Sequence, residues 1–106
     1  MDDQTLNALR RIHGVNAAFV VDPNQPAPEG GLPEAQGALL GAVFAALSRA
    51  SSDLDLGALG ETIIEAERGA VIAGALANGR AAIVLADSKA NLGMIRLELR
   101  KLRRQS

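Results

Sequence analysis

The chain contains no cysteine, tryptophan or tyrosine, and its two phenylalanines, Phe19 and Phe44, give an aromatic content of 2%. The lack of cysteine excludes disulfides, thiolate zinc sites and a cysteine nucleophile. Two aromatic rings offer almost no means of stacking bases or enclosing a quaternary cation. We therefore expect no nucleic acid among the partners of this protein.

Catalytic residue types are also scarce. His13 is the only histidine, and no serine lies in a GxSxG-type turn, so a nucleophile and its base have almost nothing to draw on. We expect His13 to satisfy carbonyl groups at a helix end. Neither residues 30–31 nor residues 57–60 match the spacing of a phosphate-binding glycine loop. We predict a protein that is not an enzyme and binds no cofactor and no metal.

The chain ends and the hydrophobic runs favour neither export nor membrane insertion. The first residues read MDDQTLNALR, which are acidic and polar, so we expect no signal peptide and, by default, a cytoplasmic location. The longest run without a polar side chain, GALLGAVFAAL at residues 37–47, is shorter than the roughly 20 apolar residues that a bilayer requires. A length of 106 residues, with 48% hydrophobic and 22% charged residues, indicates one soluble globular domain over residues 1–106.

The same run is the most informative segment, because as a helix it has two unlike faces. We expect the bulky face to pack on a sheet; it comprises Leu39, Leu40, Val43, Phe44 and Leu47. The small face comprises Gly37, Ala38, Gly41, Ala42 and Ala45. The alanines of this face could simply be exposed, because alanine is the best helix former. A glycine within a helix costs roughly 1 kcal/mol of stability relative to alanine, so its presence favours close approach by another helix. A self-associating or partner-binding module is the first hypothesis.

Local patterns predict the order helix, strand, weak strand, helix, three strands, helix. The first helix covers residues 5–13 and the first strand residues 15–21, whereas Pro26 and Pro28 weaken a strand within residues 25–31. A long helix begins near Pro33-Glu34 and runs to about Ala50. A strand at residues 61–68 precedes a hairpin, and Ser88 is expected to cap a last helix over residues 89–104. Its core-facing residues are Leu92, Ile95, Leu99 and Leu102.

Asn78-Gly79 stands between two apolar runs, residues 70–77 and 80–86, and predicts a two-residue hairpin turn of type I′. This turn would place Ala77 opposite Arg80 and Gly74 opposite Ile83. One face would carry Ile72, Leu76, Ile83 and Leu85, and the other Val71, Ala73, Ala75, Ala82 and Val84. Because both faces are apolar, we expect an α/β protein with helices on both sides of the sheet, in three layers.

Two charged clusters allow several interpretations. Glu61, Glu65 and Glu67 alternate along the predicted third strand. Paired carboxylates can perform acid–base chemistry or bind a hard cation, and they could also lie at the margin of a dimer seam. We favour a third interpretation, in which the charges protect an edge strand from pairing with other chains. The end of the last helix, residues 96–106, carries five cations against Glu98, a local charge of +4: Arg96, Arg100, Lys101, Arg103 and Arg104. Nucleic acid or anionic lipid would suit them, but we favour a solvated face whose cations match the helix C-terminus.

Five segments in this order and spacing carry a family resemblance. They are residues 14–22 (GVNAAFVVD), the small-residue helix at 37–47, residues 59–64 (LGETII), the Asn78-Gly79 hairpin and residues 91–96 (NLGMIR). Together they resemble the Roadblock/dynein light chain family over nearly the whole chain. The resemblance implies a profilin-like α/β/α sandwich with a five-stranded, mostly antiparallel sheet. The first and last helices would cover one face of that sheet and the middle helix the other.

The resemblance also implies a function. Members of the family form homodimers by joining their third strands and packing their middle helices. They regulate or tether small Ras-like GTPases, in some cases as activators, or act as dynein and lysosomal scaffold subunits. On this basis we expect a homodimer interface at Gly37, Ala38, Gly41, Ala42, Ala45, Glu61, Ile63 and Glu65.

By the same resemblance, GTPase contacts are expected at Glu34, Ser48 and Arg49. Arg49 could act as an arginine finger, which stabilises transition-state charge, but we favour either a contact at the rim or a simple solvent-exposed charge. A small-ligand sensory module and a purely structural scaffold subunit are the alternatives to a GTPase regulator.

Overall fold

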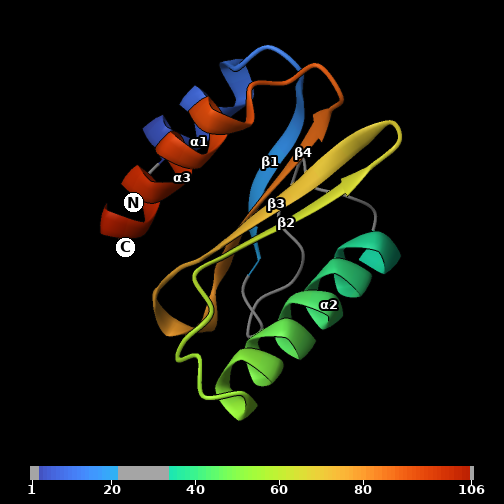
Figure 1. Ribbon diagram of the computed structural model, residues 1–106. Helices are drawn as coiled ribbons and strands as arrows, with labels where there is room; N and C mark the ends of the chain where they lie inside the picture. The colour runs from blue at the N-terminus through green and yellow to red at the C-terminus, as the bar shows by residue number, and fades with distance from the viewer. Residues whose placement is uncertain (1–2, 22–33, 106) are drawn as a thin grey trace.

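The computed structural model describes residues 3–21 and 34–105, which form three helices and four strands in three layers (Figure 1). Helices α1 (Asp3–Arg11) and α3 (Leu92–Gln105) lie side by side on one face of the sheet, and α2 (Glu34–Asp53) covers the other. The strands are β1 (Val15–Val21), β2 (Glu61–Ala66), β3 (Gly69–Ala75) and β4 (Ala81–Asp87). None of the described helices is both long enough and apolar enough to span a bilayer.

The four strands form an antiparallel sheet in the order β1-β4-β3-β2. This arrangement confirms the mixed α/β class and the antiparallel sheet. The fifth strand, predicted within residues 25–31, lies outside the described residues. Strand β2 stands at an edge, and within the described residues it pairs only with β3.

Each face of the sheet has its own hydrophobic core. On the α1–α3 face, the core contains fully buried side chains from both helices and from two central strands: Leu9, Ile72, Val84, Ile95 and Leu99. The predicted core spacing of α3 is thus confirmed at Ile95, Leu99 and Leu102, while Leu92 is half-buried. On the α2 face, Phe19, Ala73, Ala81 and Ile83 are buried, and α2 adds the half-buried Leu40 and Phe44.

The turn between β3 and β4 differs from the prediction. Three residues, Ala77–Gly79, form a short 3₁₀ turn that ends with Gly79 at φ +77°, and the N–H of Leu76 donates to the carbonyl of Arg80 at 2.9 Å. A three-residue loop closed by a glycine of positive φ is a common alternative to the two-residue turn.

The longer turn shifts the register by one residue, so Gly74 faces Ala82 instead of Ile83. The prediction of shared faces was therefore wrong for β4. Val84 and Ala82 join Ile72 on the α1–α3 side, whereas Ile83 and Leu85 join Val71 and Ala73 on the α2 side. A shift of one residue exchanges the two faces of a strand, and here both faces are apolar, so neither pattern was excluded in advance.

Several helix ends also differ from the predictions. Asn91, not Ser88, caps α3, because its Oδ1 accepts a hydrogen bond from the N–H of Met94 at 3.1 Å. Helix α1 ends at Arg11 instead of His13; the N–H groups of Ile12 and Val15 donate to the carbonyls of Leu9 and Ile12. His13 is exposed and makes no hydrogen bond within the described residues.

Helix α2 continues past Ala50 to Asp53. The buried Ser51 hydroxyl then donates to the carbonyl of Gly57 at 2.8 Å, which holds the following loop against the helix end. Strand β2 ends at Ala66, and the turn into β3 consists of Glu67 and Arg68.

Candidate functional site

Helix α2 presents an exposed apolar surface. The predicted bulky face spans about 140° of the helix circumference at 100° per residue, which is too wide to face the sheet as a whole. Leu40 and Phe44 do pack on the sheet, as predicted. Leu39 does not: it is 66% exposed, and Val43 and Leu47 are also exposed. The placement of Leu39 against the sheet was therefore wrong.

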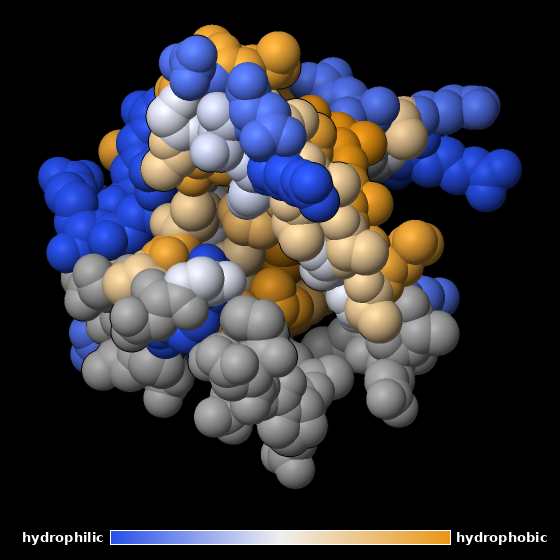
Figure 2. All heavy atoms as spheres, turned by 90° about the horizontal axis from the view of Figure 1, so that it is seen from below, coloured by the Kyte–Doolittle hydropathy of each residue, from blue (hydrophilic) through white to orange (hydrophobic). Residues whose placement is uncertain are grey.

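The small face of α2 borders a hollow in its own chain. Gly37, Gly41 and Ser48 are half-buried and line a hollow of about 670 Å³, together with Leu59 and Leu76 of the same chain. Viewed from below, hydrophobic side chains form the floor of a hollow (Figure 2). Ala38 and Ala45 border the same hollow but are exposed, and Ala42 is exposed outside it.

Gly41 has no close neighbour within the described chain. A Cβ atom added there would meet nothing within 4 Å outside its own helix turn, and the same is true of Gly37. The described fold therefore does not require a glycine at either position.

Strand β2 extends the exposed apolar surface. Ile64 and Thr62 point to the α2 side and share a narrow cleft with Val43 and Leu47. Ile64 is exposed, and no strand within the described residues covers the outer edge of β2. We call the exposed side chains Leu39, Val43, Leu47 and Ile64 the α2–β2 surface.

The opposite side of β2 carries Glu61, Ile63 and Glu65, which pair in register with Gly74, Ile72 and Ala70. Glu61 is tied to α3: Arg96 Nε donates to its Oε1 at 2.9 Å, and Arg100 Nε lies 3.7 Å from its Oε2. The carboxylate thereby joins the sheet edge to α3. No local sequence pattern predicts this pair, because its two residues are 35 positions apart in the chain.

The three glutamates do not form a joint site. Glu65 is exposed on the strand and Glu67 lies in the β2–β3 turn, while Glu61 is engaged by α3. No group of three or more His, Asp or Glu side chains in the described part of the chain could hold a metal ion. The acid–base and cation interpretations of this cluster therefore have no geometric support.

The residues expected to contact a partner lie on α2. Ser48 lines the hollow, and Arg49 is exposed and lies 3.8 Å from Asp53 one turn later. Such a pair of exposed charges holds Arg49 weakly. Glu34 is the first residue of α2, and its side chain is outside the described residues.

Comparison with solved structures identifies the fold. A Roadblock/LC7 domain from Streptomyces avermitilis superimposes with a TM-score of 0.78, covering 97% of this chain and 92% of that chain at 18% identity. MglB of Myxococcus xanthus superimposes with a TM-score of 0.71, covering 94% of this chain and 83% of that chain at 16% identity. The chain therefore has a Roadblock-family fold.

Sequence comparison adds a nearer relative. The uncharacterized protein MJ0714 of Methanocaldococcus jannaschii is 35% identical, over 95% of this chain and 89% of that protein. The chain belongs to the same family as MJ0714. No protein-family model matches the chain.

Proposed function

We propose that this Roadblock-fold protein is a homodimeric, non-enzymatic cytoplasmic module that binds a small Ras-like GTPase and regulates or tethers it. The observation that carries this proposal is the α2–β2 surface. Apolar side chains exposed together next to an unpaired strand edge are typical of an interaction site. The Roadblock fold, which MglB also has, supports the proposal, because members of the Roadblock family regulate or tether small Ras-like GTPases.

The proposed dimer joins the free edges of two β2 strands in antiparallel orientation and packs one α2 against the other. Pairing two edges satisfies backbone N–H and C=O groups that otherwise face water. The expected contacts include Ile63 beside Glu61 and Glu65 at the seam. Between the helices, the expected contacts are the α2 residues of the α2–β2 surface together with Gly37, Gly41 and the alanines at 38, 42 and 45, whose small side chains would allow close approach. Residues 1–106 then act as one Roadblock-like domain.

Regulation in this arrangement needs no catalytic side chain from the module. A partner that binds one conformation of the GTPase switch regions more tightly shifts their equilibrium toward it. Glu34, Ser48 and Arg49 all lie on α2, so paired α2 helices would present two copies of each. We assign Arg49 to the rim of the GTPase contact.

Light scattering coupled to gel filtration tests the dimer with a matched pair of substitutions. Leu39→Glu places a charge on the α2–β2 surface, and we expect it to yield monomers. Leu97→Glu makes the same change at a residue of α3 that is 51% exposed, on the opposite layer, and should leave the dimer intact. A wild-type protein that is monomeric at high micromolar concentration would overturn the dimer.

A pull-down with a Ras-like GTPase, loaded with GDP or with a GTP analogue, tests the second half of the proposal. We expect binding that depends on the nucleotide and weakens in Arg49→Ala but not in Arg68→Ala, which removes the same charge from the β2–β3 turn. The absence of binding in both nucleotide states would overturn it.

A small-ligand sensory module is the second candidate, because the hollow beneath α2 is large enough for a small organic molecule. Native mass spectrometry of the purified protein distinguishes the two candidates. A stoichiometric small molecule retained by wild type and lost in Gly41→Leu would favour the sensory function.

A further inference from the structure

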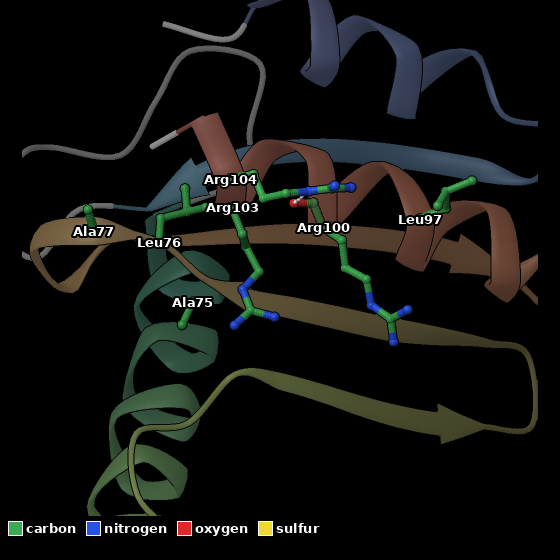
Figure 3. Close-up of a pocket in the computed structure, with 7 residues that line it drawn as sticks. All are labelled: Ala75, Leu76, Ala77, Leu97, Arg100, Arg103 and Arg104. Carbon is green, nitrogen blue, oxygen red and sulfur yellow. Dashed lines mark hydrogen bonds between the residues drawn. The ribbon is translucent and has the colours of Figure 1, made fainter.

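A shallow depression lies beside the C-terminal half of α3, on the layer opposite α2 (Figure 3). Four of its lining residues are apolar and three are arginines. The lining residues are Ala75, Leu76, Ala77, Leu97, Arg100, Arg103 and Arg104. None of these lining residues is among the dimer and GTPase contacts proposed above.

Arg103 is the unusual residue of the depression. It is half-buried, and its side chain passes over two glycines: a Cβ atom added at Gly60 would lie 3.2 Å from Nη2, and one added at Gly74 would lie 3.6 Å from Cδ. Within the described residues, Arg103 makes no hydrogen bond and no ion pair. A partly desolvated cation without a counter-ion is unfavourable, which points to a missing anion.

The neighbouring arginines do not remove this charge imbalance. Arg104 donates from Nε to the carbonyl of Arg100 at 3.4 Å and meets no carboxylate in the described chain. The carboxylate nearest to Arg100 is that of Glu61, at 3.7 Å, which Arg96 already binds at 2.9 Å. Of these four arginines, only Arg96 and Arg100 lie within 4 Å of a carboxylate in the described chain, and it is the same one. Arg100 and Arg103 extend from α3 in the same direction, across β3 toward β2 (Figure 3).

We propose that this depression is an anion site that binds a phosphate group, with Arg103 as its central ligand and Arg100 and Arg104 beside it. The planar guanidinium fork matches the oxygens of a phosphate, and charge-assisted hydrogen bonds of this kind are strong. A phosphate group of charge near −2 also offsets most of the local positive excess. Leu76 and Leu97 lie where the carbon part of the ligand would pack.

Two sources supply such a group: the headgroup of an anionic phospholipid and a soluble phosphate ester. Titration calorimetry with inorganic pyrophosphate tests the soluble source. Sedimentation with vesicles of phosphatidylcholine, alone or mixed with phosphatidic acid, tests the lipid source. We expect binding in at least one arm, and it should weaken as salt concentration rises.

Substitutions at Arg103 locate the site. Arg103→Gln should weaken binding about tenfold or more, since the loss of a charge-assisted hydrogen bond is of that order. Arg103→Lys, which keeps the charge without the fork, should lose less. Arg68→Gln removes the same charge from the far end of β3 and serves as the matched control. Circular dichroism checks that each variant is folded.

Three results would overturn the site. One is the absence of binding to both pyrophosphate and phosphatidic acid vesicles. Another is an equal loss in Arg103→Gln and Arg68→Gln, which would reflect net charge alone. The third is binding to polyglutamate but to neither phosphate probe, which would assign the cluster to an acidic protein instead.

Discussion

On the α1–α3 face of the sheet, Leu9, Ile95 and Leu99 are completely buried, whereas on the α2 face Leu39, Val43 and Leu47 each keep a third or more of their surface exposed. Both faces are apolar along β3 and β4. The first face is closed by two amphipathic helices packed side by side, and the second by a single helix that is apolar nearly all round. One core is complete within the described residues, and the other leaves apolar surface available to a partner.

The two faces also differ in charge. Helix α3 carries the basic cluster and an ion pair to the sheet edge, while the charges of α2 are restricted to its two ends. We therefore expect the α1–α3 face to contribute most of the folding stability and the α2 face to bind the partner. The following substitutions test that division.

The largest effect is expected from truncating the closed core. Leu99→Ala should lower the free energy of unfolding by about 2–5 kcal/mol, because it leaves a cavity among completely buried side chains. Leu39→Ala, the same change on the α2 face, should cost less than about 0.5 kcal/mol in the monomer. Urea unfolding followed by far-ultraviolet circular dichroism measures both, since the chain lacks tryptophan and tyrosine. Equal losses would contradict the comparison.

A smaller effect, of opposite sign, is expected at Gly41. Gly41→Ala should stabilise the folded monomer by about 1 kcal/mol, because alanine favours the helix and its Cβ meets no neighbour outside its helix turn. The same substitution should weaken the dimer if two α2 helices approach closely, which sedimentation at several concentrations measures. Gly69→Ala is the control: its Cβ would collide with the carbonyl of Ala86, so it should destabilise the fold. A dimer of unchanged affinity in Gly41→Ala would remove the argument for close helix packing.

The smallest effect concerns the ion pair between β2 and α3. Glu61→Gln removes the charge that binds Arg96 and should lower stability by about 0.5 kcal/mol, because the arginine is partly exposed to solvent. The loss should shrink at high salt. Glu67→Gln in the β2–β3 turn should change the unfolding midpoint little. A comparable loss in both variants would mean that the effect comes from overall charge.

Much of the architecture was predictable from local patterns. The helix periodicity of α3 identified Ile95, Leu99 and Leu102 as core residues, and the Asn78-Gly79 pair identified a hairpin. Both signals act over a few residues and need no distant partner. The resemblance to the Roadblock family agrees with the fold found by structural comparison.

The predictions that were wrong concern segments whose local pattern is compatible with two different arrangements. Strands β3 and β4 are apolar on both faces, so hydrophobic alternation could not exclude a register shifted by one residue. Helix α2 is apolar nearly all round, so its rotation could not be read from composition, and Leu39 was placed on the wrong side. The dimer residues on α2 followed from its two unlike faces and from the family resemblance, and they stay predictions.

The sequence by itself determined the order of helices and strands, the two apolar faces of the sheet and the amphipathic face of α3. Periodicity and turn residues act locally, and they are sufficient for these features. Only the tertiary structure decided the register of β4, the side chains that α2 exposes, and the contacts that join Glu61 to α3 and leave Arg103 without a counter-ion. These depend on how segments distant in the chain fill the same space, which no local pattern contains.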